Sequence, residues 1–359
     1  MKRPSYRRFA LAALLLGFHS CAVLAASKPD ISELKAGPIT VHATMVRDFA
    51  RSAEGQNHSS TSKLTFRGGL ILSSPSSNFG GWSGLVVGDD AKSLLAISDS
   101  GVWMTATIVY DGIHPLGITG ARIGPLLNRK GMPIDHGRDR DSESIVLASG
   151  TLEHGTALVG FEQRHRIERY ALTSAGLSAD RGNVPLPSAA RRMRPNQGLE
   201  GMTVMKGGPY KGSLIAFSER LYDNARNHTG WLWTGNGPQT VHLKNIGDYD
   251  ITDLSSLDDG TLFVLERRFR WTEGLKVRLR RVSPDELRPG RTAEGEVLIE
   301  ADLSDQIDNM EGLSVTRLKA GEVLVTLISD DNFNHLLQRT MLLQFTVNGT
   351  RQAKARPRE

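Results

Sequence analysis

The chain has 359 residues, with 44 Lys or Arg, 39 Asp or Glu and a single cysteine, Cys21. This length supports a sizeable core in one or two domains, since all-β domains can run to about 200–250 residues undivided. One cysteine excludes an internal disulfide, and a formal net charge of +5 is too small to predict nucleic-acid binding.

The first 26 residues have the pattern of a secretory signal peptide. Basic side chains precede an apolar run at 9–18, and small residues lead to Ala26. We expect cleavage near Ala26 and a periplasmic or secreted protein, with export by the twin-arginine route left open by Arg7 and Arg8. Loss of four basic residues leaves 44 − 4 = 40 against 39 acidic ones, a net charge of +1. No other apolar stretch is long enough to span a membrane.

A self-similar unit then recurs five times. Each unit opens with two short apolar strands joined by a turn, the second ending in a carboxylate. The paired strands are predicted at 82–87 and 94–99, 142–147 and 157–162, 199–204 and 214–219, 252–257 and 261–266, and 310–315 and 325–330. Two further plausible strands follow in each unit, and four strands per repeat make one blade of a β-propeller.

The sequence therefore predicts an all-β fold, a β-propeller of five four-stranded blades over residues 27–349. Residues 64–66 or 70–72 are expected to complete the fifth blade and close the ring. Residues 39–50 are left over, so a sixth blade stays open. The charged tail at 350–359 is expected to fray.

Acidic residues repeat at two positions of this unit. The first position is occupied by Ser83, Glu143, Glu200, Asp253 and Glu311, with spacings of 60, 57, 53 and 58 residues. The second is occupied by Asp99, Glu162, Glu219, Glu266 and Asp330. Because the inner strands of a propeller surround an axis, residues repeated at one strand position form a ring there. We expect two carboxylate rings around an axial channel.

Several phrases carry a resemblance to a known family. They lie at 196–201 (NQGLEG), 265–269 (LERRF), 308–313 (DNMEGL) and 329–333 (SDDNF), with arginines at 164, 166 and 169. Together they resemble the phytase-like propeller family described as esterase-like activity of phytase, over about residues 64–347. The resemblance implies a bacterial exported propeller. It does not fix an activity, because fold does not dictate function.

Carboxylates gathered in one channel repel one another unless arginines, a cation or protons compensate them. A ring of oxygens suits Ca²⁺, and neighbouring arginines suit an anionic phosphate ester such as phytate. We therefore predict a metal-dependent phosphoester hydrolase. The catalytic candidates are Glu143, Glu200, Glu219, Glu266 and Glu311. The phosphate-binding candidates are Arg164, Arg220 and Arg267, and the metal-binding candidates are Asp99, Asp253 and Asp330.

Alternatives remain at this stage. The acids can instead pair with arginines of neighbouring blades in a non-catalytic, monomeric propeller that binds a ligand or a partner protein. The acidic loop at 135–143 favours a solvated, salt-bridged loop over a calcium loop, and Asp331 and Asn332 favour a turn over a cation site. A catalytic serine is disfavoured because Ser83 lies in a misspaced elbow, and zinc because the histidines are scattered.

Overall fold

The computed structural model describes residues 27–51, 62–134 and 136–349. The predicted signal peptide at 1–26 and the predicted tail at 350–359 lie outside the described residues, so both remain predictions. Within the described ranges, no helix is both long and apolar enough to cross a bilayer.

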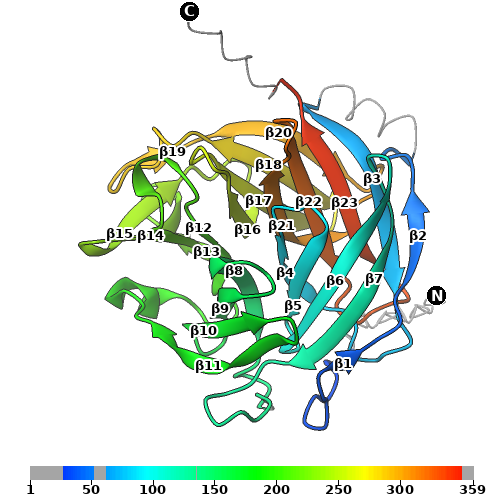
Figure 1. Ribbon diagram of the computed structural model, residues 1–359. Coiled ribbons are helices and arrows are strands. Elements are labelled where there is room, and N and C mark those ends of the chain that lie inside the picture. Colours follow the sequence, from blue (N-terminus) through cyan, green and yellow to red (C-terminus); the bar gives the residue numbers. More distant parts are fainter. Residues whose placement is uncertain (1–26, 52–61, 135, 350–359) are drawn as a thin grey trace, which may run out of the picture.

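In the described part of the chain, five mostly antiparallel sheets stand around a common centre, and the only helical segments are two short 3₁₀ turns, Ser188–Arg192 and Gly208–Tyr210 (Figure 1). From the inner strand outward, blade 1 holds β4 (Trp82–Val87), β5 (Ser93–Ser98), β6 (Val102–Asp111), β7 (His114–Pro125) and β1 (Gly37–Pro38). Blade 2 holds β8 (Ser142–Gly150), β9 (Gly155–Phe161), β10 (Arg166–Thr173) and β11 (Gly176–Val184). Blade 3 holds β12 (Leu199–Val204), β13 (Leu214–Tyr222), β14 (His228–Thr234), β15 (Gly237–Leu243) and β19 (Thr292–Ala293).

Blade 4 holds β16 (Asp250–Ser256), β17 (Leu262–Arg270), β18 (Gly274–Val282) and β20 (Glu296–Asp302). Blade 5 holds β21 (Asn309–Arg317), β22 (Val323–Asp330), β23 (Thr340–Val347), β3 (Leu64–Ser73) and β2 (His42–Val46). The chain thus forms an all-β, five-bladed propeller whose sheets have four or five strands rather than four throughout.

The inner strands form a closed circle. β4 lies beside β8, β8 beside β12, β12 beside β16, β16 beside β21, and β21 beside β4. The ring closes as expected, because β3 from the amino-terminal side pairs with β23. The leftover segment at 39–50 contributes β2, the outermost strand of blade 5, so the described residues contain no sixth sheet.

The continuous apolar runs become strands that are covered on both faces. In β17, Leu262 and Val264 pack with blade 3, whereas Phe263 and Leu265 pack with blade 5. Side chains of a strand alternate between its two faces, so a run without polar residues is what a strand between two neighbouring blades requires.

Every inner strand carries a β-bulge near its start. The residue left without a partner is Ser83, Glu143, Glu200, Thr252 or Glu311. The next residue is glycine in β4, β12 and β21, which lets neighbouring inner strands approach closely. A Cβ on Gly201 would lie 3.2 Å from the Asp253 carbonyl carbon, and one on Gly312 would lie 3.1 Å from the Leu85 nitrogen. The bulges turn the preceding polar side chain away from the ladder.

Candidate functional site

The bulges correct the predicted alignment in blade 4. There the unpaired residue is Thr252, not Asp253, which pairs with Leu265. The second predicted ring position of blade 4 is displaced in the same way. It is occupied by Arg267, which pairs with Asp250, and not by Glu266. A shift of one residue moves a strand side chain to the opposite face, so both predicted acids of blade 4 lie outside the rings.

Both displaced acids have structural partners. The Glu266 carboxylate is fully buried and accepts hydrogen bonds from Arg278 Nε at 2.7 Å and Arg280 Nη2 at 2.5 Å. Asp253 accepts backbone hydrogen bonds from Leu254 and Leu313, each at 2.7 Å, and the second ties β16 to β21. The catalytic position predicted for Glu266 and the metal-binding position predicted for Asp253 are therefore corrected to structural positions, because their oxygens face away from the other acids.

The other predicted acids do converge. They come from blades 1, 2, 3 and 5 and interact electrostatically across the blades. Together with the predicted Arg267, and with Lys28 and Asp141, which were not among the predicted site residues, they form what we call the central cluster: Asp99, Asp141, Glu143, Glu162, Glu200, Glu219, Glu311 and Asp330, with Lys28 and Arg267. Eight carboxylates thus surround two cations, an imbalance that a buried site cannot keep without protons or a further cation.

The two cations lie at different parts of the central cluster. Arg267 Nη1 lies 2.9 Å from Glu311 Oε1, and Asn309 Nδ2 donates to the same oxygen at 2.8 Å. Lys28 Nζ lies 3.1 Å from Asp99 Oδ2 and forms an ion pair with Asp141. Each cation is therefore already engaged with carboxylates of the cluster.

Three carboxylates of blade 2 form the tightest group. One oxygen each of Asp141, Glu143 and Glu162 lies within 4.8 Å of the others. Calcium–oxygen distances are about 2.3–2.6 Å, so a single ion between such oxygens is geometrically compatible with this spacing. Glu143 is only 8% exposed, and the structure gives it no hydrogen bond or ion pair with another described residue. The donor set fits a hard divalent cation.

Burial changes the acidity of the central cluster. It raises the pKa of Glu162 to about 7 and that of Glu219 to about 7. It also raises the pKa of Asp99 to about 6, although Lys28 beside it acts in the opposite direction. For Glu143 and Glu200 burial comes first and neighbouring carboxylates add to it, so each pKa lies well above its usual range. Several of these acids therefore hold protons near neutral pH.

Two of the three predicted phosphate-binding arginines pair outside the cluster. Arg164, whose side chain is 65% exposed, lies 3.0 Å from Asp139. Arg220 forms a bidentate pair with Asp250 at 2.8 and 2.5 Å and reaches Glu219 only at 3.7 Å. Arg267 alone lies inside the cluster.

The acidic loops mostly behave as turns. In the 135–143 loop, Asp139 pairs with Arg164, in line with a salt-bridged loop, whereas Asp141 and Glu143 are buried in the central cluster and Asp135 lies outside the described residues. Asp331 accepts the Gly81 N–H at 2.9 Å and the Thr340 hydroxyl at 2.8 Å, which joins blade 5 to blade 1. Its oxygens are therefore occupied by the protein itself.

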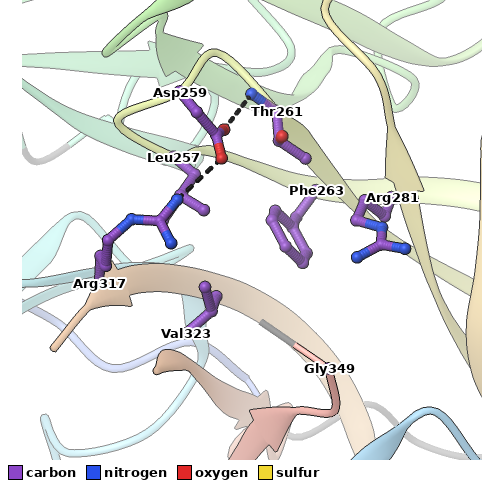
Figure 2. Close-up of a pocket in the computed structure, with 8 residues that line it drawn as sticks. All are labelled: Leu257, Asp259, Thr261, Phe263, Arg281, Arg317, Val323 and Gly349. Carbon is purple, nitrogen blue, oxygen red and sulfur yellow. Dashed lines mark hydrogen bonds and ion pairs between the residues drawn. The ribbon is translucent and has the colours of Figure 1, made fainter. Parts of the chain in front are cut away.

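A separate pocket of about 230 Å³ lies between blades 4 and 5 (Figure 2). It is lined by residues that follow β16 and by the last residue of β21, so it lies at the opposite end of these strands from the bulges. Its Arg317 pairs with Asp258 and Asp259, at 2.7 and 2.8 Å, and its Arg281 pairs with Glu296. Because both arginines are already paired with acids, this pocket is a weaker candidate site than the central cluster.

Sequence reasoning missed Lys28 and set Asp141 aside as part of a salt-bridged loop at 135–143. Asp141 lies two residues before the bulge, where the other blades have Gly81, Gly198, Asp250 and Asn309, and only the bulge register reveals this third repeated position. Lys28 belongs to no repeat, and no signal in the sequence connects it with Asp99, 71 positions later.

Comparison with known proteins gives one family. No curated protein matches the chain. Among solved structures, a catalytically inactive virginiamycin B lyase from Staphylococcus aureus with quinupristin shares 13% identity over 79% of each chain, with a TM-score of 0.35. The Dos1 propeller shares 7% identity over 78% of this chain and 73% of its own, with a TM-score of 0.34. Such weak alignments carry no functional information. The profile of the phytase-like family, described as esterase-like activity of phytase, matches residues 77–333, and the chain belongs to this family.

Proposed function

We propose that this protein is an exported phosphoester hydrolase that depends on a divalent cation, Ca²⁺ being the first candidate, and acts at the central cluster. The observation that carries the proposal is the charge imbalance there among the described residues, none of which forms a hydrogen bond or ion pair with the buried carboxylate of Glu143 beside Asp141 and Glu162. Buried carboxylates of this kind are paired or coordinate metals. Asp141, Glu143 and Glu162 are the residues that would hold the ion.

A bound cation would supply Lewis-acid stabilisation of the negative charge on a phosphoryl group. Arg267 would contact the same anionic group, because its guanidinium already lies among the acids of blades 3 and 5. Arginine suits phosphate through its planar, forked donors. The role predicted for Arg164 and Arg220 in phosphate binding stays a prediction.

Glu219 is the best-placed candidate for proton transfer. Burial raises its pKa to about 7, Arg220 lowers it, and Asp250 raises it further. A carboxyl group with such a pKa is protonated in about half of the molecules at pH 7, and the protonated form can donate to a leaving alkoxide. Glu219 is not one of the three proposed cation ligands, so its proton remains available when the site is loaded.

The test is hydrolysis of a chromogenic aryl phosphate by the purified protein, with added Ca²⁺ and with a chelator. We expect turnover only with the cation. Glu143→Gln should lower kcat/KM at least 100-fold, and Arg267→Gln should raise KM. Glu300→Gln is the matched control, because Glu300 is 54% exposed and lies outside the cluster. Turnover that ignores the chelator, or survives in Glu143→Gln, would contradict the proposal.

A non-catalytic propeller is the second candidate. The engagement of Arg164 with Asp139 and of Arg220 with Asp250 favours it, since both arginines are held away from an incoming phosphate. In that case the cation would stabilise the protein without any turnover, as binding to the folded state does.

A further inference from the structure

Lys28 reaches the central cluster from a segment that belongs to none of the blades. Its ammonium lies 3.1 Å from both Asp99 Oδ2 and the Asp99 carbonyl oxygen, and it pairs with Asp141 Oδ1. The side chains of Asp99 and Asp141 are only 13% and 9% exposed. Lys28 therefore places a full positive charge among acids that water scarcely reaches.

The segment that carries Lys28 is anchored to blade 1. Ile31, three residues later, is fully buried in the core of that blade, and a Cβ on Gly101 would lie 3.5 Å from its Cδ1. Gly37 and Pro38 then form β1 on the outer edge of the same blade. The ammonium is thus a tethered cation, held beside Asp99 and Asp141 by the anchoring of its segment.

Asp141 belongs to two groups at once. It holds the Lys28 ammonium, and it offers one of the three oxygens that lie within 4.8 Å of one another with Glu143 and Glu162. Glu143 also interacts electrostatically with Lys28. A second cation bound at Asp141 would therefore meet the repulsion of Lys28 at short range in a buried, weakly screened site.

We propose that Lys28 is a built-in competitor for the cation site: its ammonium compensates Asp99 and Asp141 when no metal is bound, and a divalent cation must displace it from Asp141 in order to bind. This inference rests on the cation site of the proposed function. It makes the affinity for metal depend on the segment ahead of blade 1.

The experiment is calorimetric titration of the purified protein with CaCl₂ at fixed ionic strength, for the wild type and for Lys28→Met, Lys28→Gln and Lys28→Arg. Lys35→Met is the matched control, because Lys35 is an exposed lysine of the same segment without an ion pair among the described residues. We expect the two neutral variants to bind Ca²⁺ roughly tenfold more tightly or better. Lys28→Arg and Lys35→Met should stay within about twofold of the wild type.

Unchanged or weaker binding in both neutral variants, with near-ultraviolet circular dichroism like that of the wild type, would overturn the competition. If the neutral variants give that result while the wild type binds Ca²⁺ and hydrolyses the aryl phosphate in the activity assay, only the proposed role of Lys28 is contradicted. If no protein in the series binds Ca²⁺, the cation site and the competition both fail.

Discussion

Blade 4 and the other blades use the same bulged inner strand for opposite purposes. Blades 2, 3 and 5 place a glutamate at the bulge and an acid on the second strand's side, one residue beyond the pair that precedes the bulge, whereas blade 4 places Thr252 and Arg267 at these positions. Its own acids, Asp253 and Glu266, lie one residue away and are fully satisfied by backbone N–H groups and arginines. An acidic side chain is thus paired and structural on one face of these strands, whereas on the other face it lies among further acids whose negative charge is not fully compensated.

The largest expected effect comes from removing the charge of a paired acid in blade 4. Glu266→Gln removes the charge that Arg278 and Arg280 share in the interior, so the unfolding free energy should fall by about 3–5 kcal/mol. Chemical denaturation measures it. Glu300→Gln, at the exposed end of the same group, should cost less than about 1 kcal/mol. Equal, small losses in both variants would contradict the structural role of Glu266.

The pH dependence of thermal stability tests the acids of the central cluster. Burial raises the pKa of Glu219 and Glu162 to about 7 and that of Asp99 to about 6. Raised acids stabilise the fold below their unfolded values, near 4, and this contribution disappears as pH rises through 6 and 7. One such shift is worth on the order of 3 kcal/mol. In chelator, Tm should therefore fall between pH 5 and pH 8, by roughly 5 °C or more. A Tm that rises over this range would show that the acids are compensated.

Glu143→Gln sharpens the contrast further. Removing one of the crowded charges should stabilise the cation-free protein at pH 8 by about 1–2 kcal/mol. The same acid-to-amide change at Asp253 should destabilise it, because Asp253 accepts two backbone hydrogen bonds. Denaturant midpoints in chelator provide the comparison, and destabilisation by both variants would remove the distinction between the two acids.

The smallest effect concerns the arginines. Arg220, with a side chain 46% exposed, forms a surface pair with Asp250, so Arg220→Gln should change the unfolding free energy by less than about 1 kcal/mol. Arg267→Gln should cost more, because it leaves Glu311 beside Asn309 without its cation. Thermal denaturation of the two variants in parallel tests whether Arg267, the cation of blade 4, contributes more to stability than Arg220.

Much of the fold could be predicted from the sequence because its signals are local. Runs such as 262–265 are apolar at every position, which only a strand between two neighbours requires, and the closing strand β3 contains both candidate segments, 64–66 and 70–72. The slip in blade 4 could not be seen, because Asp253 and Glu266 resemble the repeated acids in chemistry and differ only in bulge register. Lys28 and the partners of Arg164 and Arg220 depend on contacts between distant segments. The acids of blades 2, 3 and 5 and the neighbouring Arg267 could be predicted as a group, whereas the second counter-charge, Lys28, could not.

The central claim is that the acids of blade 2 hold a divalent cation. Crystals soaked in MnCl₂, with anomalous diffraction recorded near the manganese edge, test it most directly. We expect a strong anomalous peak between the carboxylates of Asp141, Glu143 and Glu162, absent in crystals of Glu143→Gln. Peaks confined to exposed carboxylates elsewhere, or none at all, would contradict it.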